Sequence, residues 1–293
     1  MDDLEPLDPQ FVQDQLSRLP FVTVAGVINI RDLGGLPSHL YPDLVTKPGY
    51  LYRSAELSGI TEEGKRLHKF VELSPHHALG KAQLNELGIT QVFDLRSDTE
   101  IAKYNSPVPH IDGVQISHVP VFKIEDYSPE MMAKRYQLYA SGKTEAFMEL
   151  YSQILDHGGP AFGTILRHVR DRPNEPCVFH CTAGKDRTGL AGVDNIAIAK
   201  DYALTRIGRE PARAMIIERL NKEPLFASNS EAALNMFTCR DTTMLAFLDL
   251  LDEKYAGAEE YVRCFAGLSA EDIVTIRRNL LVSVADPSIR SKA

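Results

Sequence analysis

The sequence has no apolar run long enough to cross a membrane, and its first residues lack the basic start and apolar core of a secretory signal. We therefore expect a cytoplasmic protein without a membrane span. A basic excess is also absent, because 40 acidic and 32 basic side chains give a formal net charge of -8. Proteins that bind nucleic acids hold phosphates mainly with clustered Lys and Arg, so this charge argues against a nucleic-acid partner.

Cysteine is scarce, with four residues in a chain of 293. Four cysteines could form two disulfides in a secreted protein, but a chain of this size, 44% apolar, can bury a core without such cross-links. Cys177 and Cys181 lie four residues apart, which along an extended strand is roughly 13 Å and too far for a disulfide. We expect Cys177, Cys181, Cys239 and Cys264 to be free thiols.

Strand-like and helix-like segments alternate through the first two thirds of the chain, and helical segments follow. The short β-rich segments are residues 89–95, 114–121 and 176–180, and the helical ones between them are 129–140, 143–157 and 160–170. This alternation predicts an α/β fold with a mainly parallel central sheet flanked by helices. We expect an N-terminal arm (residues 1–20), one domain (21–285) and a flexible tail (286–293).

One segment, residues 66–81, interrupts an otherwise helical pattern. The dipeptide Gly-Lys precedes it and recurs at its end, and removal of its sixteen residues would leave one continuous amphipathic helix. We hypothesise an insertion that forms a surface loop. Its three histidines are expected to be solvated, because no Cys or carboxylate set stands at metal-ligand spacing with them.

The strand predicted at residues 176–180 leads directly into the segment that carries chemistry. A buried strand, a tight loop and a helix start aim successive backbone N–H groups inward, which makes an anion site suited to a phosphate dianion. The same positive field favours a thiolate at Cys181, the expected nucleophile. Arg187 offers a planar fork for two phosphate oxygens, and Thr188 can hydrogen-bond the sulfur as leaving group. The segment reads His180-Cys181-Thr182-Ala183-Gly184-Lys185-Asp186-Arg187-Thr188-Gly189.

A leaving oxygen needs a proton, so a carboxylic acid must lie within hydrogen-bond reach of it. Asp186 in the loop is the favoured acid, Asp94 at the end of a neighbouring strand is the second candidate, and Asp126 is the third. The structural alternative for Asp94 is an ion pair with Arg31, Arg53 or Arg96.

The other loop residues are expected to bind the substrate. Lys185 and Asp186 should lie at the pocket rim, where Lys185 would favour polyanionic substrates such as phosphoinositides. The expected substrate-binding residues are Thr182, Ala183, Gly184, Lys185 and Thr188.

The ten-residue loop resembles the active-site loop of the protein tyrosine phosphatase superfamily. With three further segments, the chain is similar to the bacterial and fungal tyrosine-phosphatase-like family over most of residues 21–282. These segments are Asn29-Ile30-Arg31-Asp32-Leu33-Gly34-Gly35, Asp94-Leu95-Arg96-Ser97 and Asp201-Tyr202-Ala203-Leu204-Thr205.

The resemblance implies the cysteine-phosphatase type of fold and hydrolysis of phosphomonoesters through a phosphocysteine, without metal or cofactor. It implies phosphotyrosine substrates, and phosphoserine, phosphothreonine or phosphoinositides for some members. The expected partner is thus a phosphorylated protein or a phosphoinositide, and the oligomeric state is not predicted.

One departure from that family supports a second interpretation. Only residues 190–200 separate the loop from Asp201, where the family has a longer apolar helix, so about two helical turns are expected to be missing. The alternative function is a non-catalytic phosphate-binding pseudophosphatase. Sulfur transfer of the rhodanese type is a third option, which Thr188 and the surrounding motifs disfavour.

Overall fold

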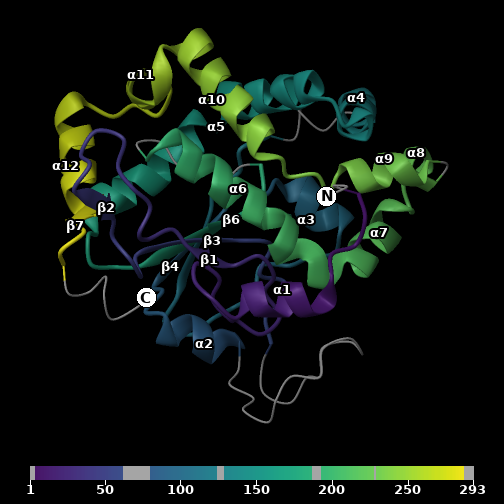
Figure 1. Ribbon diagram of the computed structural model, residues 1–293, viewed down its shortest axis with the longest axis horizontal. Helices are drawn as coiled ribbons and strands as arrows, with labels where there is room; N and C mark the ends of the chain where they lie inside the picture. Colours follow the sequence, from purple (N-terminus) through teal and green to yellow (C-terminus); the bar gives the residue numbers. More distant parts are fainter. Residues whose placement is uncertain (1–3, 62–79, 124–128, 187–192, 228, 287–293) are drawn as a thin grey trace.

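The computed structural model describes residues 4–61, 80–123, 129–186, 193–227 and 229–286. A five-stranded sheet lies in the middle of the molecule (Figure 1). Its strand order is β1 (Arg31–Asp32), β3 (Leu51–Ser54), β6 (Cys177–His180), β4 (Gln91–Asp94) and β5 (Gln115–His118). β1 is antiparallel to β3 and the other neighbours pair in parallel, which confirms the predicted mainly parallel sheet.

The central position of β6 determines where the loop begins. His180 lies opposite Ser54 of β3 and Asp94 of β4, so three strands end together beside Cys181. All four residues of β6 are buried. Cys177 and Phe179 belong to one apolar cluster and Val178 to another, so the strand is covered on both faces. A continuous apolar run is typical of such a strand, and the strand at 176–180 was predicted from it.

Helices cover both faces of the sheet. Figure 1 shows α5 (Thr144–Asp171) and α10 (Asp241–Tyr255) on one side and α2 (Gly80–Glu86) on the other. The larger apolar cluster also includes residues of α6 (Asn195–Arg209), α11 (Gly257–Phe265) and α12 (Ala270–Leu280). These observations confirm the α/β class predicted from the sequence.

The smaller elements connect and extend these layers. β2 (Leu44–Thr46) and β7 (Leu281–Ser283) form a separate antiparallel pair that joins the two ends of the domain, which the sequence did not predict. The remaining elements are α1 (Pro9–Leu16), α3 (Asp98–Lys103), α4 (Pro129–Ser141), the 3-10 helix η2 (Glu210–Ala212), α7 (Arg213–Leu220), α8 (Pro224–Ala227) and α9 (Ser230–Asn235). A third apolar cluster involves α4, α7, α8 and α9.

The expectation of two helices at 143–157 and 160–170 was wrong, because α5 is one helix with Pro160 inside it. Proline lacks an N–H and normally interrupts a helix. Here the helix packs closely on the end of α11: a Cβ at Gly159 would lie 2.3 Å from the Phe265 carbonyl oxygen, and one at Gly163 2.5 Å from that of Ala266. Tertiary packing on both sides of Pro160 therefore outweighs the local signal.

Some expectations concern residues outside the described ranges. The expected insertion at 66–81 lies outside them except for Gly80 and Lys81, which begin α2, and so do Asp126 and the tail after residue 286. The division into arm, domain and tail stays a prediction. Within the described ranges, no helix is long and apolar enough to cross a membrane.

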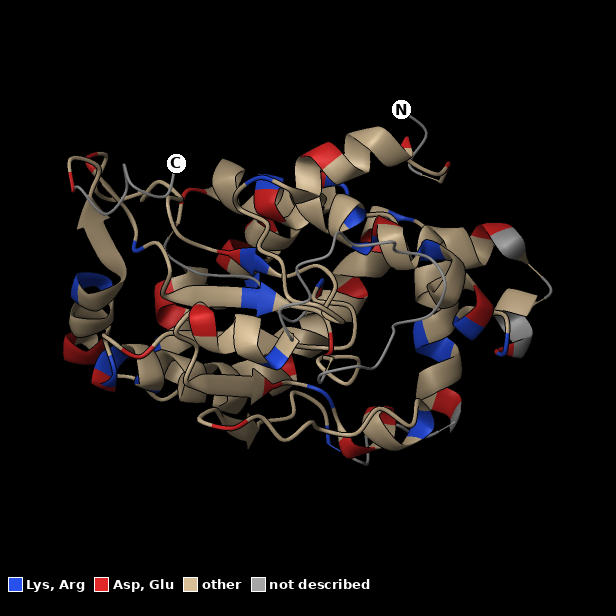
Figure 2. Cartoon of the chain, turned by 90° about the horizontal axis from the view of Figure 1, so that it is seen from below, with Lys and Arg blue, Asp and Glu red and all other residues tan. Residues whose placement is uncertain are grey.

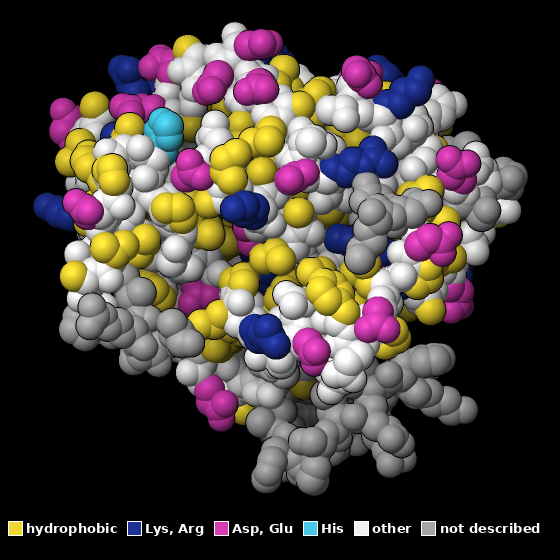
Figure 3. All heavy atoms as spheres, in the orientation of Figure 1, with side chains coloured by type: hydrophobic (Ala, Val, Ile, Leu, Met, Phe, Trp, Pro, Cys, Tyr) yellow, Lys and Arg dark blue, Asp and Glu magenta, His cyan; other side chains and the backbone are white. Residues whose placement is uncertain are grey.

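Charged side chains of both signs are spread over the molecule. In Figure 2, acidic and basic residues both occur on elements throughout the molecule, and Figure 3 shows hydrophobic side chains interspersed with charged ones on one face. Among the described residues, these views therefore show no single charged face that would mark a binding surface.

Candidate active site

Cys181 lies at the first position after β6, where the chain turns back over the strand end. Its side chain is buried, at 1% exposure, and the backbone N–H of Gly184 donates to Cys181 Sγ at 3.2 Å. Gly184 has a φ of +63°, and a Cβ there would lie 2.4 Å from the Ser54 carbonyl oxygen. Glycine is required both by the left-handed backbone and by this close approach to β3. Arg187 and Thr188 follow this turn and lie outside the described residues.

A buried ion-pair cluster lies beside the loop. Asp201 of α6 accepts hydrogen bonds from Arg31 Nε at 2.9 Å and from Arg53 Nη1 at 2.6 Å. Thr205 Oγ1 accepts from Arg31 Nη2 at 3.2 Å. Burial alone would raise the pKa of Asp201, but the charges of the two arginines outweigh it and lower that pKa. Two of the segments that resemble the tyrosine-phosphatase-like family, residues 29–35 and 201–205, thus meet in one cluster.

Asp94 forms an ion pair within its own segment. It is fully buried and accepts from Arg96 Nη2 at 2.7 Å and from Arg96 Nε at 2.9 Å, and the ring of His180 lies 3.8 Å away. Burial alone would raise the pKa of Asp94, but hydrogen bonds from Arg96 and the nearby His180 lower it. The ion-pair interpretation is therefore confirmed, with Arg96 as partner. A buried, ionised carboxylate is poorly suited to donate a proton to a substrate.

Two tyrosines, one from α5 and one from α4, hydrogen-bond the carboxylate of Asp186. Tyr151 Oη of α5 donates to Asp186 Oδ1 at 2.6 Å, and Tyr139 Oη of α4 donates to Oδ2 at 3.3 Å. The hydroxyl of Tyr202 lies 2.7 Å from that of Tyr151. Asp186 keeps 15% of its side chain exposed, whereas Asp94 is fully buried, so of these two carboxylates only Asp186 is accessible to solvent. Sequence reasoning missed Tyr139 and Tyr151, which stand in ordinary helical segments.

Lys185 does not lie at the pocket rim, which corrects the expectation from the sequence. Its side chain is 2% exposed, with Nζ 4.6 Å from the ring centre of Phe147 and 3.7 Å from Asp186 Oδ1. The aromatic face and the carboxylate both attract the ammonium, which draws the side chain inward. The ammonium of Lys185 is therefore buried between Phe147 and Asp186.

Thr182 is fixed by a residue that sequence reasoning did not single out. Its hydroxyl donates to Glu100 Oε1 at 2.8 Å, while Glu100 Oε2 accepts from the backbone N–H of Ser97 at 3.0 Å. Ser97 and Glu100 form the capping box that begins α3. The Ser-x-x-Glu spacing was the available signal for this arrangement. The loop is thereby tied to the strand end that carries Asp94.

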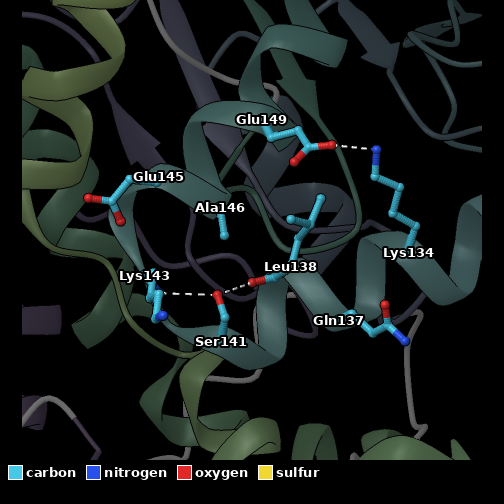
Figure 4. Close-up of a pocket in the computed structure, with 8 residues that line it drawn as sticks. All are labelled: Lys134, Gln137, Leu138, Ser141, Lys143, Glu145, Ala146 and Glu149. Carbon is cyan, nitrogen blue, oxygen red and sulfur yellow. Dashed lines mark hydrogen bonds and ion pairs between the residues drawn. The ribbon is translucent and has the colours of Figure 1, made fainter.

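Two cavities lie near these elements. A surface hollow of about 420 Å³ between α4 and α5 has none of the described loop residues, 180–186, among its lining residues (Figure 4). A smaller apolar cavity of about 100 Å³ is lined by Asp186 and Tyr151 together with apolar residues of the sheet, α5, α6, α10 and α11.

All four cysteines are free thiols, as predicted. Among the described residues, no group of three or more His, Cys, Asp and Glu side chains is placed to hold a metal ion. The site in this part of the chain is thus built from one thiol, loop amides, a tyrosine-held carboxylate and buried ion pairs.

Comparisons with known proteins agree with this geometry. The triple specificity protein phosphatase PtpB of Mycobacterium tuberculosis is 26% identical over 292 residues, which cover 87% of this chain and 97% of that protein. A tyrosine-protein phosphatase of Nostoc commune is 24% identical over 191 residues, 62% of each chain. Residues 22–282 match the tyrosine phosphatase family. The chain therefore belongs to the tyrosine phosphatase family and is a cysteine-based phosphatase.

Proposed function

We propose that this phosphatase hydrolyses phosphomonoesters through a covalent phosphocysteine at Cys181. The thiolate attacks phosphorus, an S–P bond forms, and the P–O bond to the leaving group breaks as Asp186 protonates the leaving oxygen. Water then attacks phosphorus, Asp186 accepts its proton, and the S–P bond breaks to give inorganic phosphate and the thiolate. The observation that carries the proposal is the turn in which the Gly184 N–H points at Cys181 Sγ.

The remaining roles follow from the loop. Backbone N–H groups of residues 182–186 would bind the phosphate oxygens, while Arg187 and Thr188 keep the roles proposed from the sequence: a fork for the phosphate and a hydrogen bond to the leaving sulfur. Asp186 is favoured as the acid over Asp94, because Asp186 is partly exposed and Asp94 is buried in its ion pair.

We further propose phosphotyrosine as the principal substrate, with phosphoserine, phosphothreonine and phosphoinositides as additional substrates. The family match and the triple specificity named for the mycobacterial relative support this range. A cytoplasmic location and the absence of a nucleic-acid partner remain predictions from the N-terminal composition and the net charge.

The proposal is tested by hydrolysis of p-nitrophenyl phosphate, with vanadate as inhibitor and thermal melts to verify folding. We expect vanadate-sensitive turnover in the wild type and none in Cys181→Ser. Cys177→Ser is the matched control, because Cys177 is buried at the other end of β6 and should leave turnover in place. A panel of phosphotyrosine, phosphoserine and phosphoinositide substrates then defines the range. A folded wild type without turnover would instead support the phosphate-binding alternative.

A further inference from the structure

Two buried side chains hold the carbonyl groups of the active-site loop. Asn29 Nδ2 donates to the carbonyl oxygens of Ala183 and Gly184 at 3.0 and 3.1 Å. Arg53 Nη2 donates to those of Gly184 and Lys185, both at 2.9 Å. Three consecutive carbonyls, of residues 183, 184 and 185, are therefore directed toward Asn29 and Arg53.

The direction of these carbonyls determines the direction of the amides. In a trans peptide the C=O and the following N–H point to opposite sides. The peptide between Ala183 and Gly184 shows the consequence, since its oxygen accepts from Asn29 while its N–H donates to Cys181 Sγ. The same rule turns the N–H groups of Lys185 and Asp186 away from Arg53 and Asn29. Side chains outside the loop thus orient its anion-binding amides.

Asn29 and Arg53 are themselves fixed in orientation. Asn29 is 3% exposed and its Oδ1 accepts from Arg31 Nη1; because arginine can only donate, Oδ1 must face Arg31 and Nδ2 must face the loop. A Cβ at Gly208 would lie 2.2 Å from Asn29 Oδ1, so α6 packs tightly against this amide. Arg53 is 2% exposed, and its other terminal nitrogen donates to Asp201.

We propose that Asn29 and Arg53 are positioning residues that hold the loop amides in their phosphate-binding orientation before any ligand arrives. This inference rests on the proposed function, because it concerns the same anion site. Donors that are already oriented need no reorganisation when charge develops on the phosphate, so their alignment should affect anion affinity and turnover together.

The test uses tungstate, a phosphate-like anion, and measures its affinity by calorimetry beside kcat and KM for p-nitrophenyl phosphate. Asn29→Asp keeps the shape of the side chain and the oxygen that accepts from Arg31, and aspartate tolerates the φ of +57° at this position. It replaces the Nδ2 donor by an oxygen, which cannot donate to the carbonyls of Ala183 and Gly184. Arg53→Lys keeps the positive charge beside Asp201 but loses the planar guanidinium, which donates to Asp201 and to two loop carbonyls at once. We expect each variant to weaken tungstate binding about tenfold or more and to lower kcat/KM by about 10²-fold. If Asn29→Asp does not fold, Asn29→Gly removes the amide and suits the same backbone.

Matched controls exist elsewhere in the chain. Asn279 Nδ2 donates to the carbonyls of Val169 and Arg170 at 3.0 and 2.9 Å, and Arg167 Nη2 donates to two successive carbonyls after α11. Asn279→Asp and Arg167→Lys should lower the melting temperature and leave tungstate affinity and kcat/KM unchanged.

The outcomes separate this inference from the proposed function. Variants at Asn29 and Arg53 that lose only thermal stability, as the controls do, would overturn the positioning role. A wild type that binds tungstate without hydrolysis would refute the proposed function, while weaker tungstate binding in the variants would still support the positioning role. A folded wild type that binds no tungstate would overturn the inference, because no anion site would exist to be oriented.

Discussion

Asp201 is predicted to be among the most stabilising carboxylates of this fold. Its side chain is 7% exposed and pairs with the buried guanidinium groups of Arg31 and Arg53. Asp201→Asn keeps the shape but leaves two buried cations without their counter-charge, and breaking a buried pair in this way costs about 3–5 kcal/mol. Domain stabilities are typically about 5–15 kcal/mol, so a large share of the free energy of unfolding should be lost.

Urea unfolding followed by far-UV circular dichroism measures this loss, and a thermal melt should show a decrease of about 5–9 °C. Asp156→Asn is the matched control, because its ion pair with Lys254 is exposed and should contribute at most about 1 kcal/mol. A double-mutant cycle adds Arg53→Met, whose effect should be smaller in the Asp201→Asn background than in the wild type. A loss at Asp201 no larger than at Asp156 would refute the reasoning.

Further predictions concern the acid, the turn and the pH dependence of stability. Asp186→Asn should lower kcat/KM, which reports the step that forms the phosphocysteine, by about 10²–10⁴ for phenyl phosphate and by less for p-nitrophenyl phosphate, whose leaving group needs little protonation; equal losses of kcat/KM for the two substrates would exclude Asp186 as the acid. Gly184→Ala should weaken tungstate binding in calorimetry and lower the melting temperature, since its Cβ would lie 2.4 Å from a β3 carbonyl oxygen; wild-type affinity would contradict this. Burial lowers the pKa of His180, while at Asp94 and Asp201 charged partners outweigh burial and lower the pKa. The folded state thus binds fewer protons than the unfolded one, so the urea midpoint should fall as pH drops below about 6.5, and again below about 4; a constant midpoint would contradict it.

The sequence was most informative where local pattern and burial agree. The apolar run ending at His180 predicted a central strand, and the alternation of segments predicted the parallel sheet, because buried parallel strands need apolar residues on both faces. The tight loop that follows this strand predicted Cys181 as the nucleophile at the strand's end. Pro160 was misleading, because its local signal opposes a helix whose neighbours pack on both sides of it.

The partners of the site residues were harder to predict, because they are far apart in the sequence. Asp201 lies 170 residues from Arg31, and Asp186 lies 35 and 47 residues from its two tyrosines. No spacing rule joins such residues, and only the packing of α4, α5 and α6 beside the loop brings them together. The inward position of Lys185 likewise depends on Phe147, which the loop sequence does not reveal.

The central claim is that Cys181 carries the phosphate during turnover. Acid quenching of the wild type while it hydrolyses p-nitrophenyl phosphate, followed by proteolysis and mass spectrometry, tests this claim most directly. We predict one phosphate on the peptide that contains Cys181 and none on the corresponding peptide of Cys181→Ser. Steady hydrolysis by the wild type with no phosphate on that peptide, or turnover retained by Cys181→Ser, would contradict the mechanism.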